Sequence, residues 1–492
     1  MTKKYLIGID SGTQSTKVVA SDNDGNVLLV TQAVHEPMFQ LQPGWAEQHP
    51  EDNWAKFCQA TREAMEKLPF PKSEIAAIGL TGQRGTSTLV DRDGNHLRPF
   101  IVWLDIRYGN IGQWLKENEP EIVAKAYKLT SVQGWLNKKL TGEFKDCAAY
   151  PPTGPASVTT SFSWPEDPKE YESFGIPREM LVDLVPPGTV YGCITKEAAE
   201  LTGLPEGLPV VSGAGDKQCE VLGGGAIAPG EAYATYGTLS SLITTVYDQY
   251  VASPTGAYYT LGAAVPGAWS PETSVRGHWM VTWFKEEFGN SAVLEAAKRG
   301  VSAEQILNEE AEKVPPGSQG LIVFPYWDAR AVCPEARGMM FGFYNGTHKR
   351  PHVFRAILEG IAYGLRSSID TYSVDFGVPI QKVVVGGGGS KSDIGMQATA
   401  DIWGVPIQRP HTSETCALGA AMEAAVGTGM YQDFPEAVQY MTRAQRTFEP
   451  IPANQKLYDD VYNQVFTKVY PSFKEVFKNL NRITAYESGK LI

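Results

Sequence analysis

The amino-acid sequence predicts a mixed α/β fold. Short runs of β-branched and aromatic residues alternate with segments whose apolar residues recur every three to four positions, the spacings of strands and helices. Glycine-rich turns stand where several of the predicted strands end. The chain has 492 residues, and at roughly 100 to 200 residues per domain it should contain two to four domains.

The first part of the chain reads as strands interrupted by a helix. The predicted strands are 5–10, 17–21, 27–30, 75–80, 88–90, 100–103 and 209–211. From Pro50 the apolar positions take helical spacing, and acidic residues in the first turn suit the helix dipole. The stretch 150–187 is rich in Pro, Gly, Ser and Trp with little periodicity, so we expect an irregular excursion there.

The second part continues the alternation. Strands are predicted at 233–236, 239–244 and 383–385, and helices at 217–222, from Pro351 onward and at 391–403. Similar loops of glycine and hydroxyl residues lie between strands near Gly12 and near Gly237. This weak internal repeat suggests two related halves whose loops face one phosphate chain.

Composition and charge exclude several classes of protein. The net charge of −12 disfavours a general nucleic-acid binder, because an acidic surface repels phosphate backbones. No apolar stretch resembles a signal peptide or approaches the ~20 residues of a membrane span. The sequence therefore predicts a cytoplasmic protein that binds neither nucleic acid nor membrane.

The turn after the first strand has the make-up of a phosphate-binding loop. Gly12 lets backbone N–H groups approach an anion, and hydroxyl, amide and lysine side chains stand beside it. The polar members are Asp10, Thr13, Gln14, Ser15 and Lys17. A polar β-turn in which Asp10 bonds its own backbone is an equally good interpretation of this loop alone.

A glycine run after the strand at 383–385 suggests a nucleotide site. Gly386, Gly387 and Gly388 precede a predicted helix near Ser392, and helix N-terminal N–H groups bind phosphate readily. Together with Gly237 and Thr238 this gives two candidate phosphate loops. The alternative is that the glycines serve only close packing.

Three further segments place polar residues at strand ends. Asp216 follows a strand and begins a helix, so it is either a helix cap or a general base for phosphoryl transfer. Trp103, Asp105 and Arg107 occupy alternate positions, which in a strand would point to one side and suit a sugar. Their alternative is a surface ion pair beside a core tryptophan. Gln83 and Arg84 join the same site or form an ordinary exposed turn.

As a set, these motifs resemble those of the FGGY carbohydrate kinases, which belong to the actin and hexokinase superfamily. The match runs from about Tyr5 to Tyr431. The segments that carry it are 9–15, 43–49, 103–107, 140–143, 213–216, 236–238, 358–361 and 386–392. The resemblance implies two ribonuclease-H-like domains, 1–244 and 245–492, that flank a cleft, with sugar bound mainly by the first domain and ATP between the two.

The resemblance also implies roles for single residues. Asp216 matches the catalytic base, and Asp10 matches the carboxylate that holds Mg²⁺ through water. The residues that match the loops around the β- and γ-phosphates are Gly12, Thr13, Gly237 and Thr238, and those that match the adenosine side are Gly386, Gly387 and Gly388. A homodimer is common among members of the family.

The sequence departs from the family around the sugar. Gln83 is followed by Arg84 and Gly85, where ketopentose kinases have Met-His-Gly and glycerol kinases have Arg-Glu. We expect Gly85 to leave space for a substrate larger than glycerol. Arg84 either binds the carboxylate of an aldonate such as gluconate or bonds neutral hydroxyls. The implied substrate is a ketopentose such as xylulose, with a polyol or an aldonate as the alternative.

Two other classes of function remain open from the sequence. A nucleotide-driven switch would use hydrolysis to change a partner interaction, but only about sixty residues follow Gly429, too few for a peptide-binding domain. A sugar sensor without catalysis is disfavoured because Asp10, Thr13, Asp216 and Thr238 are all present.

Overall fold

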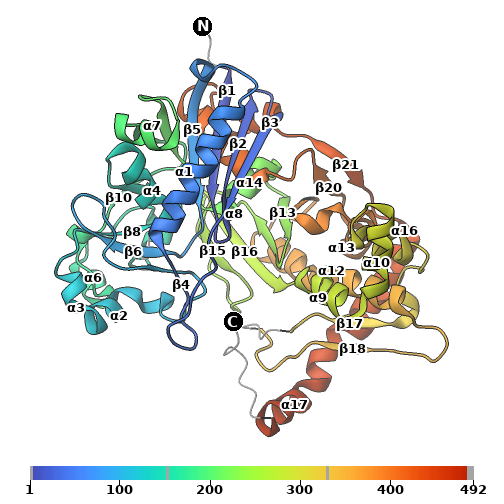
Figure 1. Ribbon diagram of the computed structural model, residues 1–492. Helices are drawn as coiled ribbons and strands as arrows, with labels where there is room; N and C mark the ends of the chain where they lie inside the picture. The colour runs from blue at the N-terminus through green and yellow to red at the C-terminus, as the bar shows by residue number, and fades with distance from the viewer. Residues whose placement is uncertain (1–3, 151–153, 328–331, 485–492) are drawn as a thin grey trace.

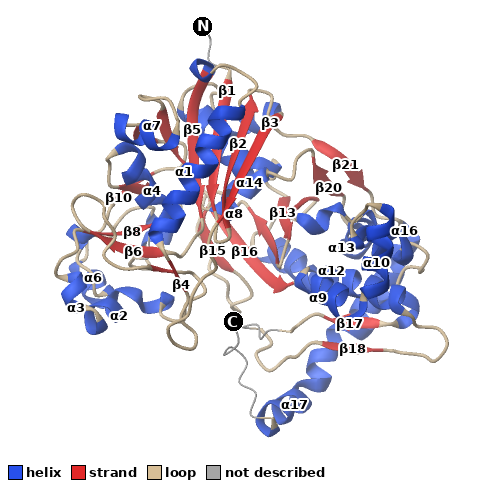
Figure 2. Ribbon diagram, viewed as in Figure 1, coloured by secondary structure: helices blue, strands red, loops and turns tan. Residues whose placement is uncertain are grey.

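The computed structural model describes residues 4–150, 154–327 and 332–484. Part of the predicted excursion, 151–153, lies outside the described residues. In the described part, none of the helices is long and apolar enough to cross a membrane. Two large sheets form the framework of the described chain, one of six strands and one of seven (Figures 1 and 2).

The first sheet is built from the N-terminal part of the chain. Its order is β11 (Val190–Cys193), β12 (Pro209–Ser212), β5 (Ile75–Gly82), β1 (Tyr5–Ser11), β2 (Ser15–Asp22) and β3 (Val27–Val34). β1, β2 and β3 form an antiparallel meander, whereas β1, β5 and β12 run parallel. The predicted strands therefore exist, and tertiary pairing extends most of them by a few residues.

The second sheet repeats this plan. Its order is β15 (Tyr259–Gly262), β16 (Trp269–Arg276), β14 (Leu239–Thr244), β13 (Glu231–Tyr236), β19 (Lys382–Gly386), β20 (Ile407–Pro410) and β21 (Ala444–Phe448). β13, β14 and β16 are antiparallel neighbours, with β15 added outside β16, and β13, β19 and β20 run parallel. The internal repeat seen in the sequence is therefore confirmed as a repeat of topology.

The two sheets divide the chain earlier than the sequence predicted. β14 ends at Thr244, but β13 and β14 both pair with strands of the second sheet rather than the first. A boundary after residue 244 would cut that sheet, so we propose to place the division between Ser212 and Glu231. The sequence did not predict this boundary, because the residues of a β-hairpin do not indicate which sheet the hairpin joins.

Helices α8 (Asp216–Gly224) and α14 (Thr415–Gly427) pack together between the sheets (Figure 1). Glycines allow this contact: a Cβ on Gly223 would lie 2.0 Å from the Thr415 carbonyl oxygen, and one on Gly419 would lie 2.0 Å from that of Cys219. Although α14 comes late in the chain, it packs on β1 and β5 of the first sheet. The two lobes are thus joined through a tight helix pair.

Further elements enlarge each lobe. The first lobe carries a small sheet in the order β4 (Glu47–Gln48), β7 (Phe100–Ile101), β6 (Ser87–Val90) and β8 (Lys128–Ser131), and a two-stranded pair of β9 (Lys145–Cys147) and β10 (Asp183–Val185). Its helices are α1 (Pro50–Lys67), α2 (Ile111–Asn118), α3 (Pro120–Val123), α4 (Val132–Thr141), α5 (Val158–Ser161), α6 (Pro168–Phe174) and α7 (Lys196–Thr202). The second carries α9 (Trp279–Phe288), α10 (Asn290–Arg299), α11 (Ala303–Ala311), α12 (Arg350–Asp375), α13 (Asp393–Trp403), α15 (Phe434–Met441), α16 (Pro452–Val461) and α17 (Thr467–Ile483), with the hairpin β17 (Ile322–Phe324) and β18 (Met339–Phe341). Figure 1 shows α2, α3 and α6 on the outer side of the first lobe and α9, α10 and α12 in the second.

Candidate active site

Three parallel strands of the first sheet end at one edge and bring polar residues together. Asp10 lies near the end of β1, Gln83 and Arg84 follow β5, and Asp216 follows β12 after a short glycine-containing turn. Carboxyl ends of parallel strands are where open α/β sheets commonly bind ligands. The edge therefore unites four residues from three segments that are distant in the sequence.

Asp216 is the first residue of α8, and Gly215 occupies the N-cap position, so the helix-cap interpretation is wrong. Its Oδ1 accepts a hydrogen bond of 2.8 Å from the Lys217 backbone and lies 3.1 Å from Arg84 Nε. Burial raises the pKa of Asp216, and the nearby cations Arg84 and Lys217 only partly offset this. A raised pKa makes the carboxylate a better proton acceptor.

Asp10 has an incompletely satisfied carboxylate. Its Oδ1 is buried and has no hydrogen-bond partner. Burial raises the pKa of Asp10 to about 7, and the negative charges of Asp216 and Glu220 add to the effect. An unpartnered oxygen in such a negative field fits a divalent cation.

The described residues contain no group of three acidic, His or Cys side chains that could hold a metal ion by themselves. Mg²⁺ commonly uses one or two carboxylates and completes its shell with phosphate oxygens and water, so a Mg²⁺ site does not require such a group.

Thr13, Gln83 and Trp103 form a hydrogen-bonded chain beside this edge. Thr13 Oγ1 donates to Gln83 Oε1 at 2.9 Å and accepts from Trp103 Nε1 at 3.0 Å. The Gln83 side chain is buried and also donates to Gln48. Trp103 remains 38% exposed, so its indole can contact a ligand while its N–H stays fixed. Gln48 was not singled out from the sequence.

Arg84 is held between two carboxylates. Besides Asp216, its Nη1 donates to Glu272 Oε2 at 2.8 Å, and Glu272 lies on β16 of the second lobe. The space expected at Gly85 is not there: a Cβ at this position would meet Trp103 and Tyr108 at 2.9 Å, and its φ of +68° favours glycine in any case. The expectation of extra room at Gly85 is therefore wrong.

The alternation predicted for Trp103, Asp105 and Arg107 is also wrong. β7 ends at Ile101, and 103–107 form turns. Asp105 and Arg107 are buried against each other, with Nη2 of Arg107 donating to Glu47 Oε1 at 2.8 Å and its guanidinium 3.6 Å from the Trp45 ring centre. These contacts make the pair part of the structural core, so we leave both residues out of the proposed sugar site.

Several residues of the predicted phosphate loop have partners in the protein. Gly12 N–H donates to the Ser15 carbonyl at 3.1 Å, within the turn itself, and His35 N–H donates to the Gln14 carbonyl at 2.9 Å. Ser15 Oγ accepts from Gln32 at 2.8 Å, and Lys17 forms an ion pair of 2.6 Å with Glu414. The polar-turn alternative holds only in part: Gln14, Ser15 and Lys17 have partners within the protein, but Asp10 Oδ1 bonds no backbone group. Thr13 contacts Gln83 and Trp103 of the site.

The second sheet presents backbone rather than charge at the corresponding edge. β13 and β19 are parallel, with Thr235 opposite Gly386, so Gly237, Thr238 and the 386–388 run emerge side by side. Gly387 has a φ of +82°, and a Cβ there would lie 2.8 Å from the Tyr236 carbonyl oxygen. At Gly388 a Cβ would meet nothing within 4 Å. Glycine is therefore required at one position and open space stands beside the next.

Ser392 has a structural role. It is the N-cap of α13, where its Oγ accepts from the Gly395 N–H at 3.1 Å and donates to Asn308 at 2.6 Å. Its polar atoms are thus satisfied within the lobe. We leave it out of the proposed nucleotide site.

The edges of the two sheets are linked by polar contacts. Thr235 of β13 donates to Glu220 of α8, which also pairs with Lys217 at 2.8 Å. A second link is the Arg84–Glu272 pair. Sequence reasoning missed Glu220 and Glu272, because a lone glutamate in a helix or strand carries no motif and the partners lie far away in the chain.

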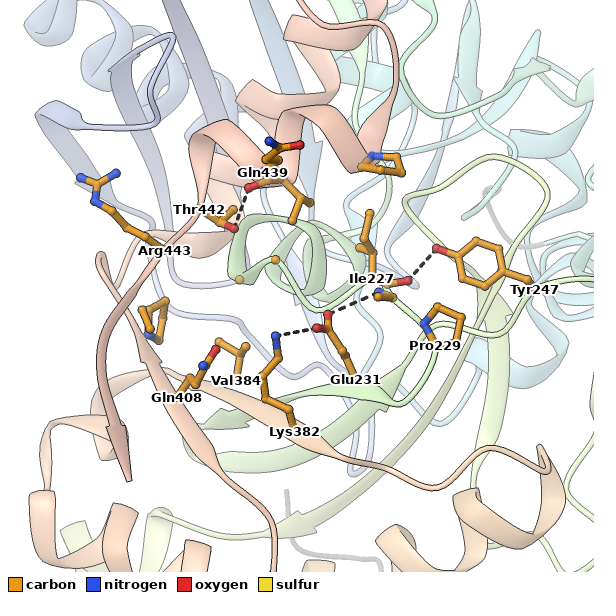
Figure 3. A pocket seen from close by; sticks show the side chains of 17 residues that line it. Ile227, Pro229, Glu231, Tyr247, Lys382, Val384, Gln408, Gln439, Thr442 and Arg443 are labelled. Atoms are coloured by element: carbon orange, nitrogen blue, oxygen red, sulfur yellow. Dashed lines mark hydrogen bonds and ion pairs between the residues drawn. The ribbon is translucent and has the colours of Figure 1, made fainter. Parts of the chain in front are cut away.

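A separate cavity of about 710 Å³ lies at the opposite end of the second sheet (Figure 3). Glu231 and Lys382, at the starts of β13 and β19, line this cavity and form an ion pair of 2.5 Å with each other. The proposed phosphate loops lie at the other ends of these two strands. The cavity therefore does not coincide with the candidate active site.

Comparison with known proteins agrees with this geometry. The N-terminal domain model of the FGGY family of carbohydrate kinases matches residues 5–113 and 111–223, and the C-terminal domain model matches 232–428. The chain is 35% identical to the uncharacterized sugar kinase YgcE of Escherichia coli K12, over 100% of this chain and 98% of that protein. It is 30% identical to a glycerol kinase of Shewanella sp. ANA-3, over 93% and 97% of the two chains.

Solved structures share the fold. A ligand-bound xylulose kinase from Lactobacillus acidophilus superposes with a TM-score of 0.83 at 21% identity, covering 97% of this chain and 100% of that one. A gluconate kinase from the same organism gives 0.82 at 22% identity, covering 97% and 99%. The two-domain actin and hexokinase-like fold implied by the sequence is confirmed, and the chain belongs to the FGGY family of carbohydrate kinases.

Proposed function

We propose that this protein transfers the γ-phosphoryl group of ATP to a terminal hydroxyl of a small neutral sugar, with a ketopentose such as xylulose as the first substrate to test. The observation that carries the proposal is the convergence of Asp216, Asp10 and Arg84 on one sheet edge, linked to glycine-rich loops of the other sheet. Phosphoryl transfer requires positioning and charge stabilisation of this kind.

Asp216 acts as the general base. It accepts the proton of the sugar hydroxyl as that oxygen forms its bond to the γ-phosphorus and the bond to the β-phosphate oxygen breaks, which releases ADP. Arg84 orients the carboxylate through its Nε. The Trp103 indole packs on the sugar, held by its bond to Thr13.

Backbone of the second lobe holds the nucleotide. Gly237 and Thr238 lie along the β- and γ-phosphates, and Gly386, Gly387 and Gly388 allow the chain to approach the adenosine side. Asp10 would hold Mg²⁺, which neutralises phosphate charge when bound.

The two ion pairs of Arg84 favour a neutral sugar over an aldonate as substrate. Asp216 and Glu272 already occupy the guanidinium, so an acid sugar would bring a third carboxylate to one cation. A polyol remains the alternative among neutral substrates.

The test is ADP release with Mg²⁺-ATP against ketopentoses, polyols and aldonates. Strong turnover with one neutral sugar is the expected result. Preference for an aldonate would overturn the proposed role of Arg84, and the absence of any sugar-dependent turnover would overturn the kinase proposal.

A further inference from the structure

Glu272 is a buried carboxylate that reaches the sugar-binding edge from the other lobe. Its side chain is 3% exposed and comes from β16 of the second sheet, while its partner Arg84 follows β5 of the first. None of the segments that carry the resemblance to the family in the sequence includes it. A charged group held this deeply normally needs a specific partner.

Both ends of the pair stay charged. Burial alone would raise the pKa of Glu272, but Arg84 and Lys217 together hold it below its usual value. The pKa of Arg84 is raised by Glu272, Tyr259 and Asp216, which together outweigh the effect of burial. The guanidinium therefore faces two ionised carboxylates, Asp216 and Glu272, before any substrate arrives.

Glu272 also fixes the orientation of Arg84. It takes the Nη1 end at 2.8 Å, and Asp216 takes Nε at 3.1 Å, so opposite sides of the guanidinium are tied to different lobes. Removing one tie would free donors that match a carboxylate bidentately.

We propose that Glu272 is a positioning residue that makes the site select neutral sugars and reject acid sugars. It acts through Arg84, because it accepts a hydrogen bond from the guanidinium and neutralises part of the positive charge that an aldonate carboxylate would need. Because like charges brought together in a buried site repel strongly, the glutamate also repels that carboxylate directly. The inference rests on the proposed function and names the feature that sets its substrate class.

The test is Glu272→Gln, which keeps the shape and removes the charge. We expect kcat/KM for the best neutral sugar to fall modestly, and the ratio of kcat/KM for gluconate to that for the neutral sugar to rise by about tenfold or more, mainly through a lower KM for gluconate. Glu231→Gln is the matched control, because it removes an ion-paired carboxylate of the same sheet at the remote cavity. An unchanged ratio in a folded Glu272→Gln variant would overturn the proposal.

Gluconate binding measured by calorimetry separates this inference from the kinase proposal. If the wild type phosphorylates no sugar, the proposed function fails, yet tighter gluconate binding to Glu272→Gln than to wild type would still support the charge selection. Should Glu272→Gln fail to fold, Glu272→Asp, which pulls the carboxylate back from Arg84, is expected to shift the ratio in the same direction. No shift there would also overturn the proposal.

Discussion

Six strands of each sheet follow the same order, but the two sheets end on different chemical groups. At the edge of the first sheet, β1, β5 and β12 lead to side chains that carry charge, Asp10, Arg84 and Asp216. At the edge of the second, β13 and β19 lead to glycines and a threonine. The first sheet therefore ends in charged side chains, whereas the second sheet ends in exposed backbone that an anion can approach.

The difference between the two edges shows how two halves of one repeated topology can serve different chemical roles. In the proposed mechanism, proton transfer needs a side chain of tuned pKa, and burial raises the pKa of Asp216. Phosphate binding needs N–H groups and close approach, which glycine supplies. Substitutions at the first edge should therefore abolish chemistry, and substitutions at the second should weaken nucleotide binding.

The largest effect is expected at Asp216. Asp216→Asn should reduce turnover by about 10² to 10⁴ because the proton acceptor is lost. The fold should persist, since Arg84 keeps its contact with Glu272. Steady-state kinetics with a thermal unfolding control checks this, and near-wild-type turnover would remove Asp216 from the mechanism.

At Asp10 activity and stability should move in opposite directions. Its folded-state pKa of about 7 lies above the ordinary 3.8, so its contribution to stability is lost as pH rises from about 4 to about 7. Asp10→Asn should lose turnover yet be more stable than wild type above pH 7, by roughly 1 to 4 kcal/mol without metal. The stability difference should vanish below pH 4.

Magnesium gives a second measurement at this site. MgCl₂ with ADP should raise the unfolding midpoint of wild type more than that of Asp10→Asn. Equal shifts in the two proteins would show that Asp10 does not hold the ion.

At the second edge, Gly387→Ala should raise the KM for ATP several-fold and cost roughly 1 to 3 kcal/mol of stability, because its φ of +82° with ψ of 175° is a conformation that essentially only glycine adopts. Gly388→Ala is the paired variant: its Cβ stands in open space, so only the KM for ATP should change. Denaturant unfolding and ATP titrations distinguish the two. A changed KM for sugar alone would contradict the assignment of this loop to the nucleotide.

The smallest effect is expected at Ser392. Loss of an N-cap bond costs about 1 kcal/mol, so Ser392→Ala should lower stability while leaving turnover and the KM for ATP unchanged. A raised KM for ATP without a loss of stability would return Ser392 to the nucleotide site.

Local patterns in the sequence predicted the central strands of both sheets, helices α1, α8, α12 and α13, and the loops at strand ends, because each is specified by neighbouring residues. Outer strands such as β11, β16 and β20 were not predicted. The local patterns also did not predict Glu272, whose partner Arg84 is 188 positions away. Nor did they predict that Asp105 and Arg107 satisfy each other in the interior, since burial depends on Trp45 and Glu47 from another segment. The resemblance to a family supplied roles that spacing alone left open.

The most direct test of the central claim is the fate of the transferred phosphoryl group. ³¹P NMR of wild type with Mg²⁺-ATP and the best neutral sugar should show one new phosphate monoester appearing in step with ADP. Inorganic phosphate as the only new phosphorus product besides ADP would contradict the account, because the protein would then hydrolyse ATP as a switch does.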